Sequence, residues 1–175
     1  ALMRLHPPGS SELSGTLQVG DDEVLTMSAS QLRRYRGGRC AMIFQEPLLA
    51  FDPVYTVGQQ IIEGLRRHEG LSRQAARDRA LEALRQVRIP SPERRLDAYP
   101  HEMSGGMRQR AMIALALSCN PQLLLADEPT TALDATVQIQ ILILLREQQK
   151  QRGLSIVFVT HDIGAAVEIA DRVAV

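Results

Sequence analysis

The chain has 175 residues, of which 45% are hydrophobic, and this is enough for one domain with a buried core. Its 20 basic and 20 acidic residues give a net charge of zero, so we expect no nucleic-acid partner, because such proteins usually carry a basic excess. The longest apolar run, residues 139–145, is interrupted by Gln140 and is much shorter than the roughly 20 apolar residues of a membrane span. Cys40 and Cys119 lie beside apolar runs, which predicts buried thiols in a reducing compartment.

The first fifty residues predict short elements that lead to one buried strand. Gly20 and Asp21 divide an alternating pattern of apolar and polar residues, which is typical of a hairpin at a sheet edge. The apolar run after Gly38 has the length of a buried strand and ends at Gln45. The expected elements are the end of a helix at residues 1–6 before Pro7 and Pro8, a hairpin at 13–27, a helix at 29–35 ended by Gly37 and Gly38, and a strand at 40–44.

Residues 57–87 have helical periodicity twice, with Gly70 between the two helices. The segment before them, residues 46–57, contains two prolines that restrict the backbone. Its apolar side chains are expected to supply contact area to another protein. These side chains are Leu48, Leu49, Phe51, Val54 and Tyr55.

Residues 101–134 carry most of the functional information. Ser104, Gly105 and Gly106 open a helix, as a serine cap before helically spaced apolar residues indicates. The apolar run 123–126 predicts a buried strand that ends in the carboxylate pair Asp127 and Glu128. A turn then leads to Asp134 at the start of the next helix.

The last forty residues continue the alternation of helix and strand. Residues 135–150 fit a strand by the alternation of Val137, Ile139 and Ile141, but their length favours a helix with Asp134 as its N-cap. A buried strand at 155–159, a helix at 163–170 and the start of a strand at 172–175 follow. Strands that alternate with helices predict a mostly parallel α/β sheet.

Two of these patterns together indicate a phosphate site. A helix N-terminus at Ser104 offers backbone N–H groups to an anion, and Asp127 with Glu128 can hold a cation and a water. Taken singly, each pattern has a structural interpretation, as a helix cap or as the start of a turn. Their succession favours a nucleotide phosphate with Mg²⁺.

At these residues the sequence resembles the ATP-binding subunits of ABC transporters. MSGGM at 103–107 is similar to the signature motif of that family, LLLAD at 123–127 to its Walker B strand, and ALD at 132–134 to its D-loop. The phrases FQEP, ADEPTTALD and THD most resemble the importers of dipeptides, oligopeptides and glutathione. The resemblance implies a P-loop NTPase core, at residues 1–50 and 119–175, with a helical subdomain inserted at residues 51–118.

The resemblance also implies a role for each candidate site residue in the binding and hydrolysis of ATP. Glu128 corresponds to the catalytic base, and His161 to the histidine that bonds the γ-phosphate, although a histidine there can also be a helix cap. Asp127 and Gln45 are expected to hold Mg²⁺, Asp127 through water. The expected nucleotide-binding residues are Gln45, Ser104, Gly105, Gly106, Asp127 and Asp134.

The implied partners follow from the same resemblance. Ser104, Gly105, Gly106 and Asp134 would face the ATP of a second ATPase domain in a head-to-tail dimer. Residues 46–57 would contact transmembrane permease subunits at the cytoplasmic face of the bacterial inner membrane, and a periplasmic solute-binding protein would act indirectly.

The phosphate loop of this family does not occur in the 175 residues. The only lysine, Lys150, has no glycine loop beside it. Family members carry this loop just before a segment like residues 1–5, so we expect a fragment, truncated at both ends and inactive alone. Two alternatives stay open: a soluble ABC ATPase of DNA repair or translation, whose coiled-coil or basic insertions are not found here, and a non-catalytic interaction fragment.

Overall fold

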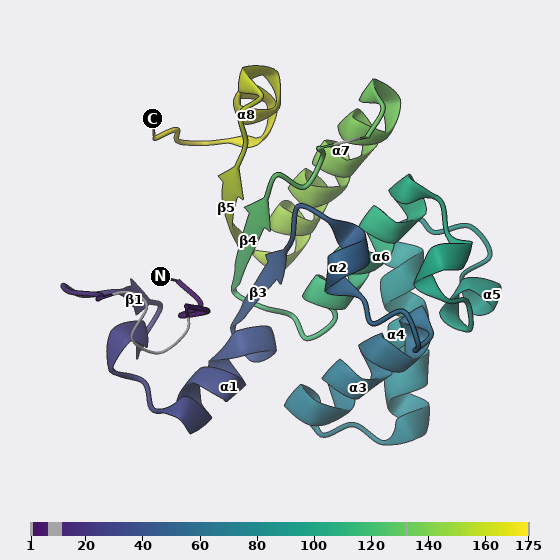
Figure 1. Ribbon diagram of the computed structural model, residues 1–175, viewed down its shortest axis with the longest axis horizontal. Helices are drawn as coiled ribbons and strands as arrows, with labels where there is room; N and C mark the ends of the chain where they lie inside the picture. The colour runs from purple at the N-terminus through teal and green to yellow at the C-terminus, as the bar shows by residue number, and fades with distance from the viewer. Residues whose placement is uncertain (1, 7–11, 132, 175) are drawn as a thin grey trace.

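Three parallel strands form the centre of the molecule. The computed structural model describes residues 2–6, 12–131 and 133–174. Strands β3 (Cys40–Ile43), β4 (Leu123–Asp127) and β5 (Ser155–Val159) lie side by side in that order (Figure 1). The register places Ala126 of β4 beside Ile43 on one side and Phe158 on the other. All three strands therefore end at the same edge of the sheet, which confirms the predicted parallel α/β arrangement.

The strands differ in burial. The central strand β4 is largely buried because its apolar run LLLA is covered on both faces. Strand β5 was predicted to be buried, and this is wrong: its residues alternate between exposed and half-buried, and Val157 and Val159 are 42% and 52% exposed. The reason is that Ser155, Val157 and Val159 lie on a face of the strand that the described elements leave exposed, while Ile156 and Phe158 pack against the main apolar cluster.

Helices pack against the three-stranded sheet and make up most of the remaining secondary structure of the described residues. Most begin at a Ser, Thr or Asp whose side chain accepts a hydrogen bond from a backbone N–H of the first turn. None of the described helices is both long enough and apolar enough to cross a bilayer. The helices are α1 (Ala29–Gly38), α2 (Pro47–Ala50), α3 (Val57–Glu69), α4 (Arg73–Gln86), α5 (Pro92–Leu96), α6 (Gly105–Leu117), α7 (Ala135–Arg152) and α8 (Ile163–Ile169), with 3-10 turns η1 (Val24–Thr26) and η2 (Pro100–Glu102).

Helices α3 to α6 pack together on one side of the sheet (Figure 1). One continuous apolar cluster includes Leu65 of α3, Leu84 of α4, Ile113 of α6, Leu124 of β4 and Leu145 of α7. The two-helix prediction for residues 57–87 is confirmed, and so is the helix after Asp134. The division into a core and an inserted subdomain stays a prediction.

The N-terminal segment differs from its prediction. Residues 2–6 form a turn and irregular chain rather than the end of a helix, while Pro7 and Pro8 lie outside the described residues. The hairpin is shorter than expected, with β1 (Gln18–Val19) and β2 (Asp22–Glu23) paired only with each other. Glu23 ends it: its carboxylate accepts the N–H of Leu25 in the following 3-10 turn and also the N–H of Leu17, just before β1.

The segment after Gln45 also differs in part. Phe51 was predicted to supply external contact area, and this is wrong, because only 3% of it is exposed and it belongs to the main apolar cluster. Val54 and Tyr55, at 69% and 52% exposed, do lie at the surface. The side chains of Leu48 and Leu49 lie outside the description.

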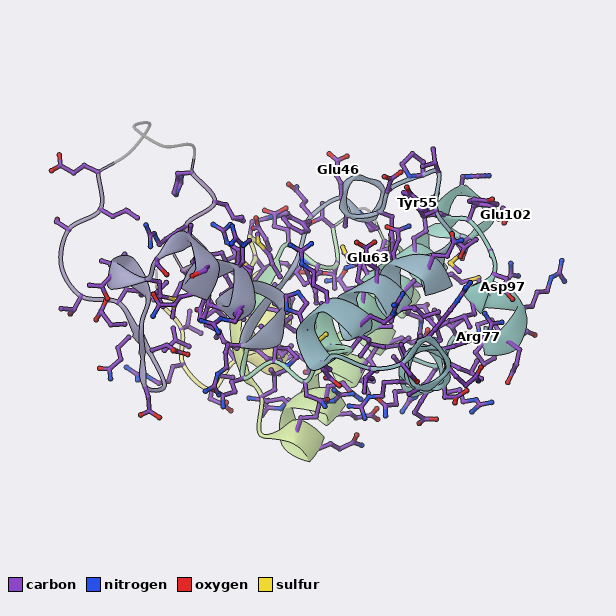
Figure 2. The ribbon with its side chains drawn as sticks, turned by 90° about the horizontal axis from the view of Figure 1, so that it is seen from below. Glu46, Tyr55, Glu63, Arg77, Asp97 and Glu102 are labelled. Atoms are coloured by element: carbon purple, nitrogen blue, oxygen red, sulfur yellow. The ribbon has the colours of Figure 1, made fainter. Side chains whose placement is uncertain are left out.

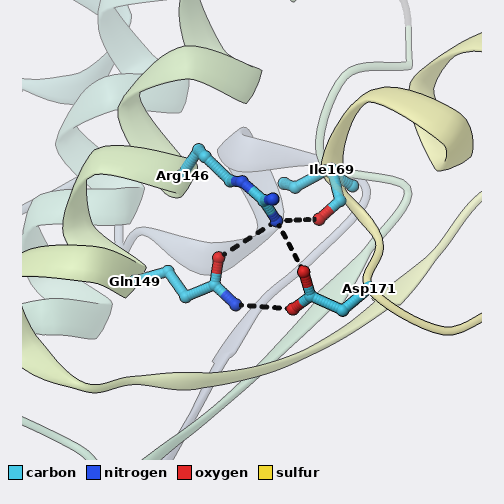
Figure 3. A network of polar contacts seen from close by, with 4 residues as sticks. All are labelled: Arg146, Gln149, Ile169 and Asp171. Carbon is cyan, nitrogen blue, oxygen red and sulfur yellow. Dashed lines mark hydrogen bonds and ion pairs between the residues drawn. The ribbon is translucent and has the colours of Figure 1, made fainter.

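Polar contacts attach the chain after α8 to helix α7. The Arg146 guanidinium donates to the carbonyl of Ile169 at 2.7 Å and to the carboxylate of Asp171 at 3.3 Å, and Gln149 donates to the same carboxylate (Figure 3). The predicted strand at 172–175 is wrong for residues 172–174, which are irregular, and Val175 lies outside the description. Of the two thiols, Cys40 is buried as predicted but Cys119 is only half-buried.

Gly37 fits a tight contact between α1 and α3. Its backbone has φ of +84°, and a β-carbon placed there would lie 2.7 Å from Nε2 of His68. Gly70, at the C-terminal end of α3, has φ of +67° but would meet no atom within 4 Å. The two glycines thus share a left-handed backbone and differ in the space around them.

We predict that Gly37→Ala destabilises the protein more than Gly70→Ala. Both changes place a side chain on a left-handed backbone, at a cost of roughly 1–2 kcal/mol. Only the first also forces His68 aside, which adds about 1–3 kcal/mol by overpacking. Urea denaturation followed by circular dichroism measures both, and equal losses would show that the His68 contact is easily displaced.

Candidate active site

The predicted site residues of the core gather at the carboxyl edge of the sheet. Gln45 follows β3, Asp127 ends β4, and His161 follows β5. Ligand sites of parallel α/β sheets lie at this edge, because the loops that leave the strand ends converge there. These residues come from separate motifs in the sequence, and the three adjacent parallel strands place them at one edge.

The side chain of Glu128 is the centre of this group. Its Oε2 accepts a hydrogen bond from Nε2 of Gln45 at 3.0 Å and another from the Thr131 hydroxyl at 2.9 Å. Its Oε1 lies 3.0 Å from Nδ1 of His161. Gln45 and His161, which lie 83 and 33 positions from Glu128 in the sequence, thus hold its carboxylate together with the nearby Thr131. The carboxylate is 24% exposed.

The backbone of Glu128 is held as firmly as its side chain. Its φ of +45° is left-handed, which is uncommon for a residue other than glycine and costs energy that the surroundings must offset. Its N–H donates to the carbonyl of Val159 at 3.0 Å, and its carbonyl accepts from the N–H of Thr131 at 3.2 Å. Thr131 was not among the site residues predicted from the sequence; its place in the turn after the carboxylate pair was the available signal.

The pKa values of Glu128 and His161 shift in opposite directions. The hydrogen bond from His161 is the main cause that lowers the pKa of Glu128, and that of Thr131 lowers it further. The same carboxylate raises the pKa of His161. In the pH range between the lowered pKa of Glu128 and the raised pKa of His161, both groups are charged, and Nδ1–H donates to the carboxylate.

Residues at this edge fit a magnesium ion by the chemistry of their donors. Asp127 offers a carboxylate at the end of β4, and Gln45 donates to Glu128 through its amide nitrogen, so its amide oxygen is the atom that can face a cation. Mg²⁺ prefers hard oxygen ligands and needs few from the protein, since phosphate and water oxygens complete its shell.

The N-terminus of α6 carries three of the predicted nucleotide-binding residues. The Ser104 hydroxyl caps the helix by accepting the Met107 N–H. A β-carbon on Gly105 would meet nothing within 4 Å, whereas one on Gly106 would lie 3.0 Å from Cγ1 of Val137. Gly105 therefore leaves the helix end open to an incoming group, and Gly106 admits the neighbouring helix α7.

Asp134, another predicted nucleotide-binding residue, lies at the start of helix α7. The Asp134 carboxylate accepts the Val137 N–H at 3.0 Å, which confirms its predicted role as N-cap of α7. One turn further, Gln138 donates to the Asp162 carboxylate at 2.7 Å and so joins α7 to the start of α8. A cavity of about 190 Å³ beside His161 is lined by residues of these segments, including Thr130, Thr131, Gln138 and Asp162.

A parallel α/β sheet with a carboxylate held at its carboxyl edge, and a helix N-terminus open to anions, is an arrangement typical of nucleotide-binding proteins. The family model described as "ABC transporter" matches residues 1–131. The chain belongs to this family.

Individual relatives within the family are named for the transport of peptides or glutathione. The chain is 50% identical over 170 residues to the dipeptide transport ATP-binding protein of Haemophilus influenzae, covering 97% of this chain and 51% of that protein. It is 49% identical to the oligopeptide transport ATP-binding protein of Bacillus subtilis, covering 100% and 49%. The glutathione import ATP-binding protein of Escherichia coli is 54% identical over 87% of this chain and 25% of its own length. The chain thus spans about half the length of the first two relatives.

Solved structures agree on the fold. A dimeric ATP-binding cassette in a post-hydrolysis state, bound to ADP and Pi, matches with a TM-score of 0.78 and 30% identity, over 89% of this chain and 66% of the other. A dimeric bacterial ABC transporter cassette matches with a TM-score of 0.77 at the same identity and coverage. The predicted ABC ATPase fold is confirmed. The relatives named above are transport proteins rather than ATPases of DNA repair or translation.

We predict that Glu128→Gln lowers the pKa of His161 toward its ordinary value. The amide removes the negative charge and the acceptor that now favour the imidazolium, so His161 would lose its proton at a lower pH. An NMR titration of the imidazole resonances measures this. Glu147→Gln, which removes an exposed carboxylate paired with Arg88, serves as the control and should leave the titration of His161 unchanged. An unaltered pKa in Glu128→Gln would contradict the pairing.

Proposed function

We propose that the complete protein is the ATP-hydrolysing subunit of a bacterial ABC importer for peptides or glutathione. The observation that carries this proposal is the carboxylate of Glu128, held by Gln45, Thr131 and His161 at the carboxyl edge of the sheet. The solute class rests on the relatives, which are named for dipeptide, oligopeptide and glutathione transport.

In the proposed mechanism Glu128 is the general base. Its lowered pKa keeps it ionised at neutral pH, so it can accept a hydrogen bond from the attacking water and orient that water toward the γ-phosphate. His161, hydrogen-bonded to Oε1 and itself 74% exposed, can reach a phosphate oxygen with its other ring nitrogen. Gln45 contacts the base from the loop after β3, the strand next to β4. From there we propose that it senses whether a nucleotide is bound.

Asp127 and Gln45 are the residues that we propose hold Mg²⁺, Asp127 through water. The ion, when bound, offsets the negative charge that develops on the phosphates during transfer. The protein's own contribution is to keep these oxygen donors beside Glu128, because both strands end at the same level of the sheet.

Ser104, Gly105 and Gly106 are proposed to bind the ATP of a second ATPase domain, with Asp134 at the same interface. The exposed N-terminus of α6 has backbone N–H groups and a partial positive charge that favour phosphate. Support for a dimer comes from the solved cassettes, which are dimeric. In a head-to-tail arrangement each site is completed by the partner's helix.

Residues 46–57 are proposed to contact transmembrane permease subunits at the cytoplasmic face of the inner membrane. Val54 and Tyr55 expose apolar surface there, and Figure 2 shows Tyr55 near the edge of the molecule that also carries Glu46 and Glu102. A periplasmic solute-binding protein would deliver the solute and act on this subunit only indirectly.

We predict that Glu128→Gln abolishes steady-state ATP hydrolysis while ATP still binds. Loss of a positioned base typically lowers the rate by roughly 10² to 10⁴. The unhydrolysed nucleotide should keep two domains together, so the variant should elute as an ATP-dependent dimer in size-exclusion chromatography. Wild-type turnover by this variant would refute the assignment of Glu128 as base.

A charged residue at Tyr55 should abolish transport and leave basal ATP hydrolysis largely intact, because the exposed ring belongs to the segment proposed to contact the permease and not to the residues proposed to act on ATP. Transport into proteoliposomes and ATPase activity in detergent measure the two effects for Tyr55→Asp. Leu13→Asp is the matched control, since Leu13 is also an exposed apolar residue, at 41%, but lies in the N-terminal segment. Equal loss of transport and hydrolysis in a folded Tyr55→Asp protein would show that the segment supports the active site instead.

A further inference from the structure

Helix α6 contacts the turn that carries Glu128. Gln109 lies one helical turn after Gly106, and only 2% of it is exposed. Its amide Nε2 donates a hydrogen bond to the backbone carbonyl of Pro129, the residue directly after Glu128. Pro129 and Thr130 are also buried, so this carbonyl depends on a protein donor rather than on bulk water.

The contact completes the hydrogen bonding of a strained turn. The Glu128 N–H is bonded to Val159, and its carbonyl to Thr131, as described above. Pro129 has no N–H, and its carbonyl is the group that Gln109 satisfies. The left-handed backbone of Glu128 persists only where its surroundings fix it, and Gln109 fixes the carbonyl of the next residue, Pro129.

Two further contacts join the same face of α6 to the chain after Glu128. Gly106 lies so close to Val137 that a β-carbon would approach Cγ1 to 3.0 Å. The Arg110 guanidinium donates to Oε1 of Gln140 at 2.7 Å. Residues 106, 109 and 110 are spaced by three and four, so they share one side of the helix. This side follows the chain from Pro129 to Gln140.

We propose that Gln109 is a positioning residue that transmits the state of the α6 N-terminus to the catalytic base of the same chain. The inference rests on the proposed function, in which Ser104 to Gly106 face the ATP of the partner domain and Glu128 acts on the chain's own ATP. Gln109 acts through the Pro129 peptide and touches neither nucleotide. The two sites of the dimer are thereby joined by one buried hydrogen bond in each chain.

Transmission is possible because the path from the α6 N-terminus to Glu128 is short and, in the described residues, consists of closely packed contacts. One helical turn separates Gly106 from Gln109, and one peptide separates Pro129 from Glu128. A displacement of α6 when its N-terminus binds phosphate therefore moves the Pro129 carbonyl, and the Glu128 carboxylate with it. Correct placement of the base then depends on ATP at both sites.

The test is Gln109→Leu in the complete protein, measured by steady-state ATP hydrolysis. Removing the donor should lower kcat by about 10- to 100-fold, the effect of misplacing a reacting group by about 1 Å, while the Kd for ATP changes little. Gln148→Leu is the matched control, because Gln148 is a buried glutamine, 4% exposed, whose partner is Arg152 near the end of α7. It should keep wild-type kcat.

A double-mutant cycle separates positioning from general support of the fold. If Gln109 acts through Glu128, Gln109→Leu should change the residual turnover of Glu128→Gln by less than about twofold, because interacting sites are not additive. An equal fold-loss in both backgrounds, or an unchanged kcat in the wild-type background, would overturn the proposal. Gln109→Met, which preserves length and removes the donor, repeats the cycle should the leucine variant fail to fold. A wild-type protein without ATPase activity would instead refute the proposed function.

Discussion

The arrangement of the site depends on one carboxylate held by three donors. Gln45 and His161 reach Glu128 from segments far away in the sequence, because β3, β4 and β5 are parallel and in a register that aligns their carboxyl ends. Thr131 reaches it from the same turn. A shift of one residue in either pairing would turn the relevant side chains to the opposite face.

The same carboxylate lies on a strained backbone, and the surrounding contacts explain how the strain is maintained. The left-handed backbone of Glu128 turns the chain sharply at the end of β4 into a buried turn. An extended backbone at this residue would instead point its side chain away from His161. The hydrogen bonds to Val159, Thr131 and Gln109 supply partners for the peptide groups of that turn. Strain of this kind is typical of functional sites, where the surroundings hold a residue in place before substrate arrives.

Helix α6 has two features within one sequence motif: an open N-terminal turn and a following turn that packs against the chain after Glu128. Its first turn is an open helix end suited to a phosphate, and its next turn is packed against the chain that follows Glu128. Because one apolar cluster includes α6, β4 and α7, these contacts are embedded in the core rather than at a flexible surface. The helix therefore connects the N-terminus that we propose binds a phosphate to the turn of the carboxylate that we propose is the base.

The sequence by itself determined the local elements and the chemical types: the Ser104 and Asp134 caps, the strand that ends in Asp127 and Glu128, and the family resemblance. These follow from short-range rules, since caps, periodicity and turn residues act within a few positions. Only the tertiary structure decided that Phe51 is buried, that β5 lies at an edge, and that Thr131 and Gln109 hold the turn of Glu128. Burial and hydrogen-bond partners depend on which segments meet in space, and Gln109 meets Pro129, 20 positions further along the chain.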